Sequence, residues 1–211
     1  MDQPPGPSYA SRGGHKLAGA LDAFGYDPAG KRALDAGAST GGFTDVLLQR
    51  GARHVVAADV GYGQLVWALQ SDPRVTVLDR TNVRALEPAQ VGEPVELVVA
   101  DLSFIPLGLV LPALVRCATP TADLLPMVKP QFEVGRERLP TGGVVRDPAL
   151  RAETVRRVAA QAAALGLGVR AVTASPLPGP SGNVEYFLWL TAQAPPLDEA
   201  LLEAAVAAGP R

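Results

Sequence analysis

Short apolar runs alternate along this chain with longer stretches in which apolar residues recur every three or four positions. The short runs are rich in Val, Leu and Ala, and they predict buried strands at 33–36, 55–59, 75–78, 95–101, 124–129, 169–174 and 184–190. The longer stretches predict helices at 13–24, 44–50, 107–116, 148–165 and 197–208. Because strands and helices alternate, we expect an α/β fold, a mostly parallel sheet with helices on both faces.

The ends of these elements add detail to the prediction. Only residues 175–183 separate the last two of the seven strands, too few for a crossover helix, so the last strand should run antiparallel. Asp147, Pro148 and Gly166 have the residue types expected at the two ends of the helix at 148–165. We expect residues 1–10 to form a flexible tail or linker stub, 11–192 one domain, and 193–211 a C-terminal helix and tail.

The composition limits the classes of protein to which this chain can belong. With 47% hydrophobic residues and no apolar run near the roughly 20 residues of a membrane span, the chain should be globular and outside the membrane. The single Cys117 suits a reducing, cytoplasmic compartment. A formal net charge of −2 argues against a surface that grips nucleic acid everywhere, so any RNA contact should be local.

The segment 35–43, Asp-Ala-Gly-Ala-Ser-Thr-Gly-Gly-Phe, predicts a tight turn from a strand into a helix. Such a turn brings backbone N–H groups close to a ligand, although a purely structural glycine turn remains an alternative. Ser39 stands where the dinucleotide fingerprint needs glycine, which disfavours an NAD-dependent dehydrogenase. The looser pattern is typical of an S-adenosylmethionine site.

Each of five predicted strands also ends at a polar residue, and in parallel sheets ligands bind beyond these ends. From the turn and the strand ends we predict these cofactor-binding residues: Asp35, Gly37, Ser39, Thr40, Gly41, Gly42, Phe43, Asp59, Thr81, Asn82 and Asp101. Asp59 is expected at the ribose hydroxyls, and Thr81 and Asn82 beside the adenine. The fifth strand ends at Lys129.

Several segments together resemble the TlyA family, whose members are often labelled haemolysins and are similar to FtsJ-type ribosomal RNA methyltransferases. The matching segments are 11–17, 35–43, 59–65, 72–75, 101–105, 128–133, 142–145 and 182–187. The resemblance implies a Rossmann-like S-adenosylmethionine-dependent enzyme that methylates ribose 2′-oxygens of cytidines in small and large ribosomal subunit RNA. Proteins of this family usually carry an S4-type RNA-binding domain before the first segment, where ten residues stand here.

The resemblance also implies a catalytic tetrad, which maps onto Lys16, Asp101, Lys129 and Glu185. Only three of the 19 basic residues are lysine, and lysine, unlike arginine, can lose its proton. We expect Lys129 to be the general base and Asp101 to orient it. Lys16 is expected to tune the basicity of Lys129 and to help position the reacting groups, and Glu185 to hold Lys16 or the ribose. A surface lysine and a plain salt bridge are the structural alternatives.

Contacts with RNA are expected near the fifth strand end. Arg12, Arg136, Arg138 and Arg146 are the predicted phosphate contacts. Tyr9 and Phe104 are the aromatics considered for base stacking, with core packing favoured for Phe104. The loop 175–183 is a candidate wall of the target pocket.

Two other functions compete with methyl transfer. A membrane-active haemolysin would need an apolar span or a basic amphipathic helix, which this sequence lacks. A catalytically silent RNA- or ribosome-binding module would not need the glycine turn and the tetrad.

With two histidines and one cysteine, no metal site is expected. The oligomeric state stays open.

Overall fold

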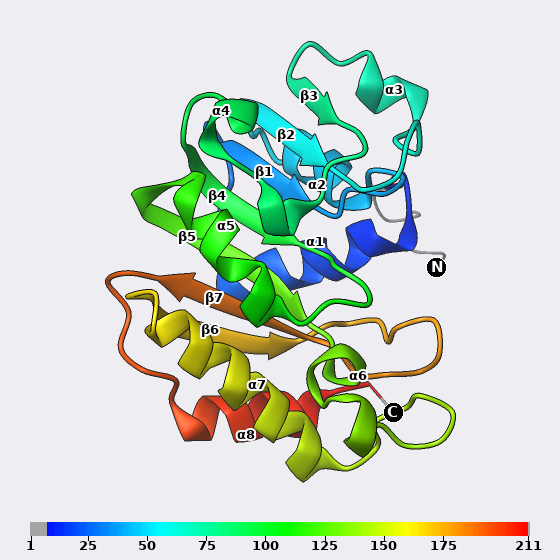
Figure 1. Cartoon of the computed structure of the whole chain (residues 1–211), viewed down its shortest axis with the longest axis vertical. Helices are drawn as coiled ribbons and strands as arrows, with labels where there is room; N and C mark the ends of the chain where they lie inside the picture. Colours follow the sequence, from blue (N-terminus) through cyan, green and yellow to red (C-terminus); the bar gives the residue numbers. More distant parts are fainter. Residues whose placement is uncertain (1–7, 211) are drawn as a thin grey trace, which may run out of the picture.

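The computed structural model describes residues 8–210, and they form a single seven-stranded sheet in the order β3-β2-β1-β4-β5-β7-β6 (Figure 1). The strands from β1 to β5 pair in parallel, and β7 is antiparallel to both β5 and β6. This confirms the predicted sheet with its antiparallel last strand. The strands are β1 Arg32–Ala36, β2 His54–Ala58, β3 Val75–Leu78, β4 Val95–Ala100, β5 Ala118–Val128, β6 Gly168–Ala174 and β7 Tyr186–Thr191.

Helices cover both faces of the sheet (Figure 1). The α-helices are α1 Arg12–Phe24, α2 Gly42–Gln49, α3 Trp67–Gln70, α4 Pro88–Val91, α5 Leu111–Arg116, α6 Pro130–Glu133, α7 Pro148–Ala163 and α8 Glu199–Ala208. The 3-10 helices are η1 Val83–Ala85, η2 Leu107–Leu109 and η3 Arg136–Arg138. Strand β1 shows how the core divides: Ala33 packs with α1 and α2 on one face, and Leu34 packs with α5, α7 and α8 on the other.

The predicted ends of α7 agree with the structure. Asp147 Oδ1 accepts a hydrogen bond from Ala149 N at 2.9 Å, and Pro148 occupies the first turn. The apolar face predicted for this helix is fully buried at Val155, Val158 and Ala162.

Three predicted elements differ from the structure. The expected helix at 107–116 is divided into η2 and α5, with Pro112 in the first turn of α5. Strand β5 begins at Ala118 rather than 124, because its first residues pair with β4 across a register shift. Strand β7 begins at Tyr186, which pairs with Ala174, so Glu185 precedes the strand instead of lying in it.

The predicted tail at 1–10 lies mostly outside the described residues. Of its described part, Ala10 N donates to Asp45 Oδ2 at 2.8 Å, which ties the segment to α2. The remaining domain limits stay predictions.

Candidate active site

The glycine turn joins β1 to α2 and approaches the end of β4. Gly37 and Gly41 have φ angles of 89° and 103°, and Ser39 has a φ of 48°. A side chain at Gly37 would overlap the backbone oxygen of Asp101, so only glycine allows the two strand ends to meet this closely. Ser39 therefore adopts the left-handed backbone conformation without being glycine, at a cost of about 1–2 kcal/mol.

Asp59, at the end of β2, holds this turn in place. Its Oδ2 accepts a hydrogen bond from Ser39 N at 2.8 Å, and its Oδ1 accepts one from Gly61 N at 2.7 Å. Carboxylate oxygens have four acceptor sites in all, so two remain for a ligand. The predicted ribose contact of Asp59 stays a prediction.

Asp35 is fully buried beneath the turn. Its Oδ2 accepts a hydrogen bond from Thr44 Oγ1 at 2.7 Å. Burial, with the carboxylates of Asp101 and Asp59 as further causes, raises the pKa of Asp35 to about 7. Asp35 is thus a support of the turn, and the structure does not place it on the surface of the cleft. Its carboxyl group points to α2, and its predicted contact with a cofactor stays a prediction.

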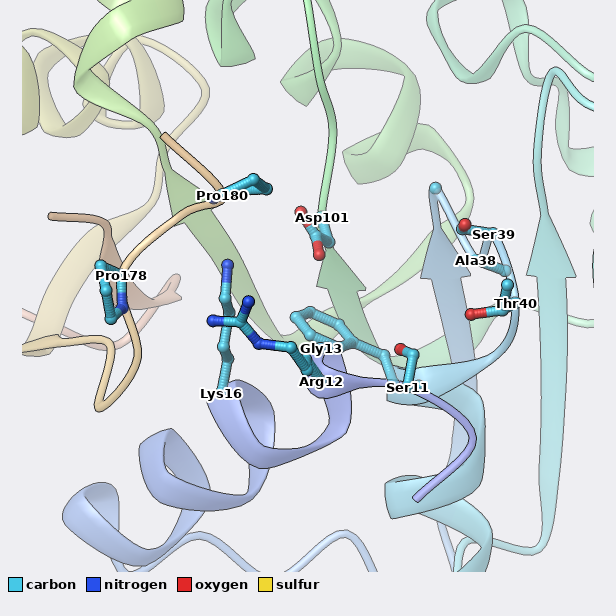
Figure 2. Close-up of a pocket in the computed structure, with 13 residues that line it drawn as sticks. Ser11, Arg12, Gly13, Lys16, Ala38, Ser39, Thr40, Asp101, Pro178 and Pro180 are labelled. Carbon is cyan, nitrogen blue, oxygen red and sulfur yellow. The ribbon is translucent and has the colours of Figure 1, made fainter. Parts of the chain in front are cut away.

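A first cleft of about 250 Å³ lies between α1 and the glycine turn (Figure 2). Figure 2 shows Lys16 from α1 and Asp101 from the end of β4 reaching into the same space, with Pro178 and Pro180 on the loop opposite. The lining residues are Ser11, Arg12, Gly13, Lys16, Gly37, Ala38, Ser39, Thr40, Gly42, Phe43, Asp101, Pro178 and Pro180. Most of the predicted turn residues therefore face one cavity.

The predicted tetrad forms two short ion pairs. Lys16 Nζ lies 2.6 Å from Glu185 Oε2, and Lys129 Nζ lies 2.6 Å from Asp101 Oδ1. Lys16, Lys129 and Glu185 are buried. The four residues come from α1, the end of β4, the end of β5 and the start of β7, so the fold gathers residues up to 169 positions apart.

A second cleft of about 770 Å³ lies on the other side of the tetrad. Lys129 and Glu185 line this cleft, whereas their ion-pair partners Asp101 and Lys16 line the first. The tetrad is therefore the wall that the two clefts share, and each ion pair crosses it. Pro180 from the predicted loop 175–183 borders both clefts, and Asn183 borders the second.

Phe104 stands at the mouth of the second cleft, with 90% of its surface exposed and a φ of 63°. The expectation that it packs in the core was wrong. The polar segment around it turns outward after β4, and its ring contacts that of Phe132 with a centroid distance of 5.0 Å. Tyr9, the other aromatic considered, packs edge-on against His15 and lines neither cleft.

The predicted residues Gly41, Thr81 and Asn82 line neither cleft. Gly41 lies under Leu65 and Leu69, where a side chain would not fit. Thr81 Oγ1 donates to Asp79 O at 3.1 Å, and Asn82 Oδ1 accepts from Arg84 N at 3.1 Å. The polar groups after β3 thus satisfy their own turn.

The predicted arginines are divided among different surfaces. Arg12 lines the first cleft and Arg136 the second. Arg146 lines a third cavity of about 850 Å³ beside α7 and α8, which borders the second cleft at Ser181. Arg138 is paired with Glu153 on α7 through both carboxylate oxygens, at 2.5 and 2.7 Å. Its guanidinium group is therefore already paired in this structure, and its assignment to RNA stays a prediction.

Sequence reasoning missed several lining residues. Ser103 accepts a hydrogen bond from Lys129 Nζ at 3.0 Å. It lies in the segment 101–105, one of those that carry the family resemblance, and this could have marked it as a site residue. Gln131 and Phe132, which follow Lys129, also line the second cleft. Ser11 and Gly13 lie in the matching segment 11–17 and Ala38 in the turn 35–43, so the same signal was available for them, although the packing of α1 against the turn was not predicted.

Within residues 8–210, no group of three or more His, Cys, Asp or Glu side chains is arranged to hold a metal ion. None of the helices in that range is both long and apolar enough to cross a bilayer.

A doubly wound sheet, a glycine turn after its first strand and a charged tetrad beyond its carboxyl edge define a Rossmann-like methyltransferase. Residues 9–192 match the model of the FtsJ-like methyltransferase family, and the chain belongs to that family. The chain is therefore an enzyme of the methyltransferase class, and the predicted resemblance is confirmed.

Relatives of known name support the same assignment. The chain is 66% identical over 186 residues to the 16S/23S rRNA (cytidine-2′-O)-methyltransferase TlyA of Mycobacterium tuberculosis, covering 88% of this chain and 69% of that protein. A solved structure of a candidate hemolysin from Streptococcus thermophilus superposes with a TM-score of 0.92 at 38% identity, covering 97% of this chain and 75% of that one. A candidate S-adenosylmethionine-dependent methyltransferase from Listeria monocytogenes shares the fold at 16% identity, with a TM-score of 0.61 over 87% of this chain and all of that one.

Proposed function

We propose that this protein transfers the methyl group of S-adenosylmethionine to a ribose 2′-oxygen of ribosomal RNA, with cytidine as the target nucleoside. The observation that carries the proposal is the tetrad between two clefts, because methyl transfer needs a donor and an acceptor on either side of a proton-accepting group. The small first cleft would hold the methyl donor, and the larger second cleft the target nucleotide.

The chemistry of the first cleft suits this cofactor. Asp59 and Asp101 follow the strands on either side of β1, next to the turn, and Asp59 keeps acceptor sites that the turn does not use. These sites suit a hydroxyl or cationic group of a ligand. S-Adenosylmethionine carries a sulfonium and an ammonium group, and it supplies an electrophilic methyl with a neutral thioether as the leaving group. Gly37, Ala38 and Ser39 line this cleft, and the small side chains of this turn allow a ligand to approach its backbone closely.

The tetrad residues have separate roles in this proposal. Lys129 first releases a proton to solvent, and as a neutral amine it then accepts the proton of the 2′-hydroxyl. The ribose oxygen bonds to the methyl carbon as the carbon–sulfur bond breaks, so one proton leaves the ribose for each methyl group gained. Asp101 at 2.6 Å and Ser103 at 3.0 Å aim its amine. Lys16 and Glu185 form the second pair, which fixes α1 against the residue that precedes β7 and positions the ribose. A positioned base contributes about 10²–10⁴-fold to the rate.

The arginines support an RNA substrate. Arg12, Arg136 and Arg146 form no ion pair with a described residue, and each lines a cavity. By contrast, Arg53, Arg74 and Arg116 are paired with carboxylates away from the three cavities. Unpaired guanidinium groups near the tetrad suit phosphates on either side of the target nucleotide. An exposed Phe104 at the same cleft offers a face for stacking a base. Such a substrate implies a cytoplasmic protein that meets ribosomal subunits.

The test is methyl transfer to ribosomal subunits from cells that lack this gene. With methyl-labelled cofactor and RNA digested to nucleosides, the label should appear in 2′-O-methylcytidine. Label in a base, or in no RNA although the cofactor binds by calorimetry, would contradict the proposed acceptor. Failure to bind the cofactor would contradict the whole proposal.

A further inference from the structure

The segment 101–107, which leaves β4, contacts α6 and the residue before it at three points. Lys129 Nζ donates to Ser103 Oγ at 3.0 Å, and the Phe132 ring packs against Phe104 at 5.0 Å between centroids. Leu107 N donates to Glu133 Oε1 at 2.7 Å. Tetrad residues stand at the beginning of each segment, so these contacts join the surroundings of Asp101 to those of Lys129.

Glu133 is the end point of this set of contacts. Only 4% of its surface is exposed, and burial raises the pKa of its carboxyl group, which the Leu107 N–H and the Arg157 guanidinium partly offset. The N–H that it accepts belongs to the first residue of η2, whose preceding residue, Pro106, has no side-chain acceptor of its own. Its Oε2 is buried without a hydrogen-bond partner among the described residues.

The position of Glu133 is itself fixed from the other side. Arg157 on α7 donates through Nη1 to the backbone oxygen of Glu133 at 2.7 Å and through Nη2 to Glu153 at 3.0 Å. Figure 1 shows α6 beyond the end of β5, beside α7. The carboxylate of Glu133 is thus a rigid anchor for a segment that otherwise lies at the surface.

We propose that Glu133 is a positioning residue for methyl transfer, which holds the segment 101–107 so that Ser103 stays on the amine of Lys129. This inference rests on the proposed function of the tetrad. Glu133 touches neither reactant, and it acts through the backbone of Leu107 and the hydroxyl of Ser103.

The backbone of the segment explains why an anchor is needed. Phe104 has a φ of 63°, a backbone conformation that is unfavourable for a non-glycine residue and persists only where the surroundings enforce it. With 90% of its surface exposed, Phe104 has little packing to enforce it. Without the bond at Leu107, the segment can relax, and Lys129 would lose the hydroxyl of Ser103 while keeping its contacts with Asp101 and the Phe132 ring.

The test compares Glu133→Ala with Glu133→Gln, which keeps an acceptor oxygen for Leu107 N. Glu137→Ala, on the exposed 3-10 helix η3, is the matched control. Three quantities are measured: hydrogen exchange of the amides in 101–110, the Kd for S-adenosylmethionine, and the single-turnover rate of RNA methylation. We expect Glu133→Ala to speed exchange in 102–107 and to lower the rate by about 10–100-fold, with the Kd within twofold of wild type. Glu133→Gln and Glu137→Ala should stay within threefold of wild type in all three.

Several results would overturn the inference. The first is a methylation rate of Glu133→Ala within threefold of wild type. The second is a rate of Glu133→Gln as low as that of Glu133→Ala. The third is a Kd of Glu133→Ala for the cofactor that rises by as large a factor as the rate falls. If the wild-type protein itself methylates no RNA, the proposed function fails, and the exchange measurement alone decides. Unchanged protection of 102–107 in Glu133→Ala would then refute the anchoring role.

Discussion

The buried pair between Lys16 and Glu185 gives the sharpest stability prediction. Their side chains are 9% and 1% exposed, and the charged atoms lie 2.6 Å apart. Removing one partner of such a pair leaves a buried charge without compensation, at a cost of about 3–5 kcal/mol. For a chain of this size, each kcal/mol lowers Tm by about 2–4 °C, so Lys16→Met or Glu185→Met alone should lower it by about 6–20 °C.

The double variant should behave differently. An apolar pair of similar volume often replaces a buried ion pair at little cost, so we expect Lys16→Met/Glu185→Met to unfold within about 2 kcal/mol of wild type. Urea unfolding of all four proteins gives the coupling energy between the two sites. The double variant should nevertheless have lost methyl transfer. If the two single effects are each below 1 kcal/mol, or if they simply add in the double variant, the pair is not buried as described.

Three further predictions concern the turn, the arginines and pH. Gly37→Ala should abolish cofactor binding in calorimetry, because the added Cβ would overlap the backbone oxygen of Asp101. The control Gly25→Ala, also at positive φ but in open space, should still bind the cofactor. Equal loss of binding in both variants would contradict the role of Gly37. Arg136→Ala should reduce the slope of the logarithm of the RNA association constant against the logarithm of the salt concentration by about 1. Arg138 is paired with Glu153, so Arg138→Ala should leave this slope unchanged. If Arg138→Ala reduces the slope and Arg136→Ala does not, the phosphate contact belongs to Arg138. The Asp35 pKa of about 7 lies above its unfolded value, so the folded state holds an extra proton between about pH 4 and 7, and stability should fall as pH rises through that range. In urea unfolding, Asp35→Asn should remove this loss, and an unchanged pH slope would refute the assignment.

The fold followed closely from local patterns. The periodicity of 148–165 and its terminal residues predicted α7, because the helix buries one face along its whole length and needs no distant information. The short loop 175–183 predicted the antiparallel last strand for a similar reason. Glu185 was harder to place, since the pairing of Ala174 with Tyr186, and not local hydrophobicity, sets where β7 begins.

The site was predicted in part. The resemblance brought Lys16, Asp101, Lys129 and Glu185 together, and the structure pairs them across two clefts. Exposure and charge pairing depend on neighbours far away in sequence. For this reason Phe104 was wrongly expected in the core, and the pairing of Arg138 with Glu153 was not predicted. Glu133 ends the matching segment 128–133, but no role was predicted for it.

The rate of methyl transfer in Lys129→Ala tests the central claim most directly. Lys31, paired with Asp123 outside both clefts, provides the matched lysine control. In a single turnover on ribosomal RNA, we predict that Lys129→Ala lowers the rate by about 10²–10⁴-fold while the cofactor still binds, and that Lys31→Ala stays within twofold of wild type. A Lys129→Ala rate close to that of Lys31→Ala would contradict the account, because the tetrad would then not accept the proton.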